Sequence, residues 1–173
     1  LIANEFFDAI PLRQFEKRHG KWLERCVGAE GMGFMPAALD NAQGANGDVI
    51  EFAPQRSGIA QEIGQRLARD GGCALIIDYG HLQTAPGDTL QAVRSHAAEH
   101  PLTSPGEADL TAQVDFAEFG RQVTASSLAV DGPITQGAFL GRLGIVERAS
   151  RLMSANPAKA GQIEMGVARL IAP

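Results

Sequence analysis

A continuous apolar run, Cys73-Ala74-Leu75-Ile76-Ile77, is the feature that most constrains the fold of this chain. A run without polar alternation is typical of a strand buried on both faces, and such strands belong to parallel sheets covered by helices. A helical pattern comes directly before it, with Ser57 as its expected cap and Gly71-Gly72 as its end. Because a helix followed by a buried strand is half of a βαβ unit, the sequence predicts an α/β domain with a parallel sheet.

Polar residues follow two predicted strands at the point where each strand ends. The short apolar run Leu1–Ala3 leads into Asn4, Glu5 and Asp8, and the run described above leads into Asp78-Tyr79-Gly80-His81. Ligands bind beyond the carboxyl ends of parallel strands, so the two clusters would border one cleft if the strands are neighbours. The alternative is a helix capped by Asn4, with Glu5 and Asp8 favoured by its N-terminus. The local pattern alone favours that alternative.

The stretch between these clusters predicts a β-hairpin, and the stretch after the second cluster predicts a short helix. Strands are expected at 21–27 and from Gly33 to Leu39, on either side of a turn at Gly31, and a flexible loop is expected from Asn41 to Gly47. Thr89 to Ala98 is expected to form a short helix in an otherwise irregular region.

The C-terminal third of the sequence is predicted to be mostly helical. Asp115 is expected to cap one helix, and Ser127–Val130 is short and β-like. Thr135 is expected to open a further helix that Gly144 breaks, and Asn156-Pro157 separates the last helical segment from the one before it.

Composition and spacing exclude several classes of function. The net charge of -5 and the lack of a dense Lys or Arg run argue against nucleic acid or anionic membrane as main partners. No apolar run approaches the roughly 20 residues that a membrane-spanning helix needs. Cys26 and Cys73 fit no metal or redox spacing, which favours a reducing compartment. His96 and His100 have the spacing of two ligands on one helical face, but no third ligand is near, so no metal site is predicted.

Six short segments occur in one order along nearly the whole chain and together carry a resemblance to a known family. They are Asn4-Glu5-Phe6-Phe7-Asp8-Ala9-Ile10-Pro11, Asp78-Tyr79-Gly80-His81, Gly87-Asp88-Thr89-Leu90, Pro105-Gly106-Glu107-Ala108-Asp109-Leu110-Thr111, Val114-Asp115-Phe116 and Gly132-Pro133-Ile134-Thr135-Gln136. The set resembles the MidA family of S-adenosylmethionine-dependent methyltransferases. The mitochondrial branch of that family is a protein-arginine methyltransferase that assists assembly of respiratory complex I.

The resemblance implies a partial class I methyltransferase sheet, which is Rossmann-like, with Leu1–Ala3 as its fourth strand and Ala74–Ile77 as its fifth. The first strands, with the glycine-rich cofactor loop and the acidic residue expected to bind the ribose, would lie upstream of Leu1. The last, antiparallel strand would follow Pro173. The expected parts of this single partial domain (1–173) are a β-hairpin insertion at 16–47, a substrate-side loop region at 82–109 and a helical layer at 131–173.

The resemblance also implies roles for individual residues. Glu5 and Asp8 would be catalytic, because two carboxylates orient a guanidinium and offset its charge. Asn4 would line the methionine end of S-adenosylmethionine. The substrate would be bound by Asp78, Tyr79, His81 and Asp109. Gln113 departs from the family pattern, which often has histidine there, so no proton-transfer role is assigned to that position.

The expected activity is therefore protein-arginine N-methylation, with a protein substrate such as a complex I subunit, and a homodimer is consistent with the resemblance. The expected location is cytoplasmic, as in bacteria, with the mitochondrial matrix as the alternative. These residues alone are expected to have no useful cofactor affinity. Two other classes stay open: a non-catalytic protein-interaction module, and a nucleotide-dependent oxidoreductase on a similar sheet.

Overall fold

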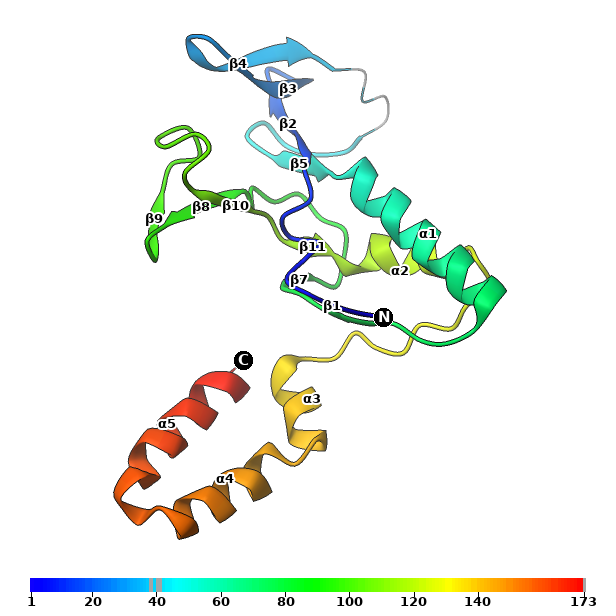
Figure 1. Cartoon of the computed structure of the whole chain (residues 1–173). Helices are drawn as coiled ribbons and strands as arrows, with labels where there is room; N and C mark the ends of the chain where they lie inside the picture. Colours follow the sequence, from blue (N-terminus) through cyan, green and yellow to red (C-terminus); the bar gives the residue numbers. More distant parts are fainter. Residues whose placement is uncertain (38, 40–41, 173) are drawn as a thin grey trace. The chain divides into compact units, whose positions relative to one another are not determined.

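The computed structural model describes residues 1–37, 39 and 42–172, and the chain divides into two compact units, Leu1–Val130 and Asp131–Pro173 (Figure 1). All strands among the described residues belong to the first unit, together with two helices, and the second unit is helical. The first unit carries both polar clusters that the sequence singles out.

The predicted parallel pair of strands is present. β1 (Ile2–Asn4) pairs in parallel with β6 (Leu75–Ile77), with Asn4 opposite Ile77. The backbone N–H of Glu5 extends the pairing by donating to the carbonyl of Ile77 at 2.8 Å. The carboxyl ends of the two strands therefore lie side by side, as the sequence predicts, and the helix cap at Asn4 is not formed.

After two residues, β6 leads into β7 (Gly80–His81), which pairs in parallel with β11 (Val114–Asp115). This pairing requires glycine at position 80. A Cβ at Gly80 would lie 1.9 Å from the carbonyl oxygen of Val114 and 2.8 Å from its carbonyl carbon. The backbone of β11 thus occupies the space that any side chain at position 80 would need.

Gly80→Ala is expected to destabilise the protein by about 1–3 kcal/mol, because relief of this overlap requires a backbone shift. Gly58→Ala is the matched control, since Gly58 lies in a helix and nothing is within 4 Å of its added Cβ. The control should be neutral or stabilising by up to about 1 kcal/mol, as alanine is the better helix former. Urea denaturation of the two variants measures the difference, and equal midpoints would contradict it.

The helices α1 (Pro54–Asp70) and α2 (Phe116–Thr124) pack against each other beside these strands (Figure 1). The Asp115 cap is confirmed, since its side chain accepts from the N–H of Glu118. The Ser57 cap is wrong: α1 begins three residues earlier, at Pro54, where the missing N–H of proline costs nothing. The core between helices and strands is built on four buried residues, namely Phe7, Ala60, Val114 and Phe119.

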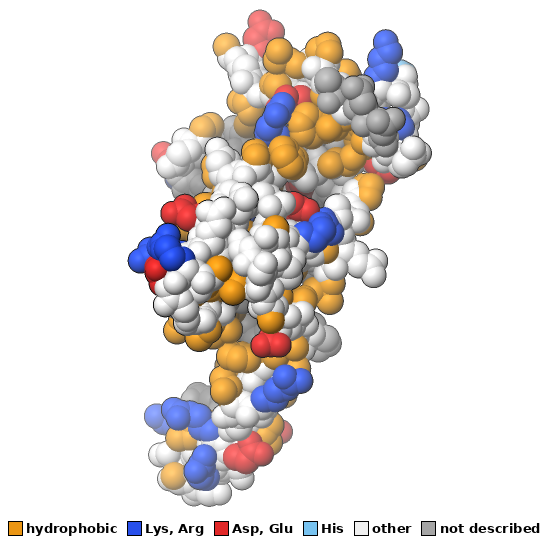
Figure 2. All heavy atoms as spheres, turned by 90° about the vertical axis from the view of Figure 1, so that its right-hand side faces the viewer, with side chains coloured by type: hydrophobic (Ala, Val, Ile, Leu, Met, Phe, Trp, Pro, Cys, Tyr) orange, Lys and Arg blue, Asp and Glu red, His pale blue; other side chains and the backbone are white. Residues whose placement is uncertain are grey.

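A four-stranded antiparallel sheet fills the region of the predicted hairpin, in the order β4-β3-β2-β5. Its strands are β2 (Arg13–Arg18), β3 (Lys21–Gly28), β4 (Gly31–Pro36) and β5 (Val49–Phe52). The strand predicted from Gly33 to Leu39 thus ends earlier, at Pro36. Part of the loop predicted from Asn41 to Gly47 lies outside the described residues. On the face drawn in Figure 2, hydrophobic side chains interrupt the polar surface in several places.

The helix predicted from Thr89 to Ala98 is wrong. β8 (Gln91–Arg94) and β9 (Ala97–Glu99) form a hairpin there, and β10 (Asp109–Thr111) pairs with β8 to complete a three-stranded antiparallel sheet. Ser95 and His96 form the turn with φ of 50° and 64°. Two consecutive positive φ values are those of a type I′ turn, which matches the twist of a hairpin. His96 is therefore not on a helical face with His100.

The second unit contains α3 (Gln136–Arg142), α4 (Ile145–Ala155), a short 3₁₀ helix, η1 (Pro157–Lys159), and α5 (Ala160–Ile171). Thr135 caps α3 and Gly144 separates α3 from α4 in the left-handed conformation, as the sequence predicts. The side-chain amide of Gln136 donates to the carbonyl of Leu170 at 2.8 Å and ties α3 to α5. No strand forms at 127–130, which precedes this unit.

Candidate functional site

The loop that follows β1, residues 5–8 (the β1 loop), is held in place by Asp78 at the end of β6. One carboxylate oxygen of Asp78 accepts from the backbone N–H of Phe7 at 2.9 Å and of Asp8 at 3.2 Å, and the other accepts from Tyr79 N–H. Burial, and then the nearby charge of Asp8, raise the pKa of Asp78, whereas these three N–H groups act in the opposite direction. Asp78 therefore positions the β1 loop through its backbone.

Glu5 lies at the start of the β1 loop in a strained backbone conformation. Its φ is 46°, in the left-handed region that costs a residue other than glycine about 1–2 kcal/mol. Its side chain is exposed, and its carboxylate makes no hydrogen bond or ion pair with the described residues. Backbone strain of this kind is concentrated at functional sites, which makes Glu5 the leading candidate for contact with a ligand.

Asp8, three residues further on, is only 4% exposed. The phenolic hydroxyl of Tyr79 donates to its Oδ2 at 2.5 Å, while Oδ1 is buried without a hydrogen-bond partner among the described residues. Burial, and then the bond to Asp8, raise the pKa of Tyr79, so the phenol keeps its proton at neutral pH. An unpaired buried carboxylate oxygen is costly, and Oδ1 of Asp8 lacks the partner that such a group usually has.

A fifth residue in this arrangement, Arg56 in the first turn of α1, is not indicated by the sequence. It is 7% exposed, and its guanidinium donates to three backbone carbonyls, those of Phe7, Ala112 and Gln113. Burial lowers the pKa of Arg56, and the surrounding carboxylates, Asp78 first, act against that shift. Arg56 precedes the cap that the sequence predicts at Ser57 and is visible in the sequence only as one more charged residue, so no pattern marks it.

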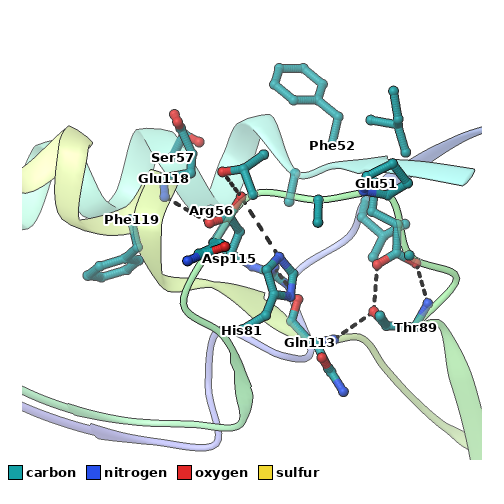
Figure 3. A pocket seen from close by; sticks show the side chains of 18 of the residues that line it. Glu51, Phe52, Arg56, Ser57, His81, Thr89, Gln113, Asp115, Glu118 and Phe119 are labelled. Carbon is teal, nitrogen blue, oxygen red and sulfur yellow. Dashed lines mark hydrogen bonds and ion pairs between the residues drawn. The ribbon is translucent and has the colours of Figure 1, made fainter. Parts of the chain in front are cut away.

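The structure also contains a cavity of about 530 Å³ beside α1 and α2 (Figure 3). His81 and Asp115 line it, with Nε2 of His81 3.9 Å from Oδ2 of Asp115. Thr89 lies between Glu51 and the backbone of Gln113, donating to the first and accepting from the second (Figure 3). His81 therefore lines a cavity whose wall includes neither Asp8 nor Tyr79.

The remaining predicted site residues are Asp109, which lies apart from these groups, and Asn4, which directly precedes Glu5. Asp109 is exposed at the first position of β10, opposite Val93, with no side-chain hydrogen bond to the described residues. Asn4 is exposed at the end of β1 and lines a second cavity of about 530 Å³, between β1 and α1. The structure thus brings together Asp8, Asp78 and Tyr79, and Glu5 begins the loop that carries Asp8.

Asn4 is the residue that the family resemblance assigns to the methionine end of S-adenosylmethionine. The amide of Asn4 is both a donor and an acceptor, which suits the ammonium and carboxylate of a methionine moiety. Phe6, 47% exposed, lies in the same cavity wall. These residues fit one end of the cofactor, and when bound the cofactor would supply the methyl group. Among residues 1–37, 39 and 42–172 there is no cluster of three or more metal-ligating side chains and no helix long and apolar enough to span a membrane.

Residues 1–134 match the model of a family described as "Putative S-adenosyl-L-methionine-dependent methyltransferase". The chain belongs to this family. It is 36% identical over 172 residues to the protein arginine methyltransferase NDUFAF7, mitochondrial, of Mus musculus, covering 93% of this chain and 38% of the mouse protein. It is 34% identical over 185 residues to the protein of the same name from Homo sapiens, covering 99% of this chain and 42% of the human protein.

The fold of this methyltransferase family member is also similar to a solved structure. The structure of a candidate methyl transferase from Burkholderia thailandensis, bound to S-adenosyl-homocysteine, superposes with a TM-score of 0.85 at 24% identity. The alignment covers 99% of this chain and 49% of that chain. The chain thus spans about two fifths of the curated relatives and half of the solved structure that it matches. The curated relatives are mitochondrial by name, so the expected cytoplasmic location is not supported.

Proposed function

We propose that this chain supplies the acceptor side of an S-adenosylmethionine-dependent protein-arginine methyltransferase. The observation that carries the proposal is the pair of carboxylates on the β1 loop, in a chain that belongs to a methyltransferase family. Glu5 offers an unpaired carboxylate in a strained conformation, and Asp8 offers a buried oxygen without a partner. A guanidinium carries N–H donors in a fixed fork and a positive charge, which are what these two groups lack.

Methyl transfer to a guanidinium nitrogen is an in-line displacement, in which that nitrogen attacks the methyl carbon, sulfur leaves with the electron pair, and the nitrogen releases one N–H proton to solvent. The demand on the protein is to align the reacting atoms and to hold one cation beside another. In our proposal Glu5 and Asp8 hold the guanidinium, Tyr79 fixes the orientation of Asp8, and Asp78 fixes the loop. Asn4 contacts the methionine end of the cofactor, while His81 and Asp109 contact parts of the substrate further from the methylated nitrogen.

The relatives' names support a protein substrate, and we propose the mitochondrial matrix as the location and a respiratory complex I subunit as the substrate. A homodimer stays a prediction. The domain boundaries predicted at 16–47, 82–109 and 131–173 are proposed as the insertion, the substrate-side region and the helical layer of the complete protein.

The test uses the complete protein, meaning this chain with the additional part that its relatives contain. Titration calorimetry is expected to detect binding of S-adenosylmethionine and none of NAD. With labelled cofactor, a peptide with one arginine should be methylated, and the same peptide with lysine in that place should not. Binding of NAD alone would assign the sheet to an oxidoreductase, and methylation of lysine alone would remove the guanidinium from the proposal.

A further inference from the structure

The β1 loop is fixed from two opposite sides by groups of opposite charge. Asp78 accepts from the N–H groups of Phe7 and Asp8, and Arg56 donates through Nε to the carbonyl of Phe7 at 2.9 Å. The ring of Phe7 is fully buried. Phe7 is thus held at its N–H, its carbonyl and its side chain.

Glu5 lies between this anchor and a second one. Its own N–H donates to the carbonyl of Ile77, so the chain is fixed at residue 5 and again at residue 7. The left-handed conformation of Glu5 is the way in which the chain spans these two points. Strained backbone conformations persist only where the surroundings determine them, and Arg56 and Asp78 are those surroundings.

Arg56 also joins the β1 loop to the segment before β11. Its Nη1 donates to the carbonyl of Gln113 at 2.9 Å, and Nη2 reaches the carbonyl of Ala112 at 3.5 Å. Ala112 in turn donates its N–H to the carbonyl of Asp8 at 3.0 Å. Arg56 therefore binds the carbonyl that precedes Asp8 directly, and it also binds Ala112, whose N–H holds the carbonyl of Asp8, the second carboxylate of the proposed site.

The segment that Arg56 holds is anchored from the far side as well. The N–H of Gln113 donates to the hydroxyl of Thr89 at 3.0 Å, and Thr89 is bound to Glu51 of β5 through its hydroxyl and its N–H (Figure 3). Glu51 itself accepts from the side-chain amide of Gln14 at 2.8 Å. Arg56 therefore links the β1 loop to a segment that is hydrogen-bonded, through Thr89, to the antiparallel sheet.

A lysine could not make the same contacts. Three carbonyls are reached by three nitrogens of one planar group, whereas an ammonium is a compact charge at the end of a flexible stem. Burial of a guanidinium is expensive unless its donors are satisfied, and here they bind neutral carbonyls. Such an arrangement is suited to setting the direction of a loop.

We propose that Arg56 is a positioning residue for methyl transfer, which acts through the carbonyls of Phe7, Ala112 and Gln113 to fix the pose of Glu5 and Asp8. This inference rests on the function proposed above, since it assigns those carboxylates to the guanidinium of the substrate. Arg56 also lines the cavity beside α1 and α2, and its proposed effect is exerted through these carbonyls and not through contact with a ligand.

The experiment is a double-mutant cycle in the complete protein with Arg56→Gln, Glu5→Gln and the pair together. A displacement of about 1 Å at a reacting group costs about 100-fold, so Arg56→Gln should lower kcat by about that factor while the Kd of S-adenosylmethionine stays within about 3-fold. The double variant should be no slower than Glu5→Gln alone, because Arg56 acts through the β1 loop. The matched control is Arg69→Gln, an exposed arginine at the other end of α1, which should be neutral.

Arg56→Lys keeps the charge and serves as the second variant if Arg56→Gln fails to fold. It should lower kcat by about 10-fold, because a lysine reaches fewer of the three carbonyls. Full activity of Arg56→Lys, activity of Arg56→Gln equal to that of Arg69→Gln, or additive losses in the cycle would each overturn the inference. Amide exchange of Phe7 and Asp8 is measured on the same proteins and should be faster in Arg56→Lys than in the wild type. If the wild type methylates no arginine, the proposed function fails, and the exchange rates still decide whether Arg56 fixes the loop.

Discussion

Glu5→Gln in the complete protein is expected to lower kcat for arginine methylation by about 100- to 1,000-fold, with binding of S-adenosylmethionine largely intact. The magnitude is that of removing one preorganised electrostatic contact from a reacting centre. The amide keeps the size of the side chain but can no longer offset the charge of a guanidinium or accept two of its N–H groups. Steady-state kinetics with an arginine peptide and calorimetry with the cofactor separate the two effects.

The matched control is Glu30→Gln, which makes the same chemical change in the turn between β3 and β4, where the side chain is exposed. It should leave kcat and stability unchanged. Retention of wild-type turnover in Glu5→Gln would remove Glu5 from the mechanism, whatever the control shows.

Replacement of Glu5 with glycine tests whether the strain at this position serves the activity. Glycine adopts positive φ without the Cβ overlap, so Glu5→Gly should remove most of the roughly 1–2 kcal/mol that a left-handed residue costs. Glycine also has a larger conformational entropy in the unfolded state, which offsets part of this gain and leaves a net stabilisation of about 1 kcal/mol. The variant should therefore be inactive and slightly more stable than the wild type in urea denaturation. A residue that lowers stability in this way is expected where activity requires its side chain.

The features that could be predicted from the sequence are those set by a few consecutive residues. The strand at Leu75–Ile77 followed from an unbroken apolar run, although the expected burial on both faces is wrong, since Leu75 is exposed and Ile76 and Ile77 are half-buried. Its pairing with β1, left conditional by the apolar pattern and implied by the family resemblance, is present. The caps at Asp115 and Thr135 followed from single side chains that accept from an N–H three residues on. In each case the determining interactions are local or depend only on hydrophobic pattern.

The region from Thr89 to Ala98 was mispredicted because its local pattern is ambiguous. Alanine, glutamine and arginine favour a helix, but Ala92 is fully buried in β8 and the pairing of β8 with both β9 and β10 outweighs that preference. Neither β9 nor β10 can be identified as a partner from this stretch alone. Tertiary pairing decided the structure here.

The different roles of neighbouring residues in the site could not be predicted from the sequence either. Asp78, Tyr79 and His81 stand within four residues, yet Asp78 binds backbone N–H groups, Tyr79 binds Asp8, and His81 lines a different cavity. The chain leaves β6 after Ile77 and enters β7 at Gly80, so the alternation of a regular strand is interrupted between them. The role of Arg56 depends on three carbonyls that are about 50 residues away in sequence, at Phe7, Ala112 and Gln113.

The adjacent phenylalanines of the β1 loop are expected to differ sharply in their effect on stability. Phe7 is 0% exposed and its ring meets that of Phe119 edge to face, with centroids 4.7 Å apart, whereas Phe6 is 47% exposed. Phe7→Ala should lower the free energy of unfolding by about 3–5 kcal/mol, the usual cost of a large cavity in a core. Phe6→Ala, the control at the neighbouring position, should cost about 1 kcal/mol.

The same two variants separate the stability of the β1 loop from its chemistry. The ring of Phe7 packs in the core that joins α1 and α2 to the strands, so its loss releases the loop that Asp78 and Arg56 orient. Below its lowered melting temperature Phe7→Ala should therefore also lose activity, and amide exchange at Asp8 should become faster. Chemical denaturation and exchange of both variants provide the measurements. Equal denaturation midpoints for Phe6→Ala and Phe7→Ala would show that the β1 loop is not anchored through the core, and the rigidity of Glu5 would then need another origin.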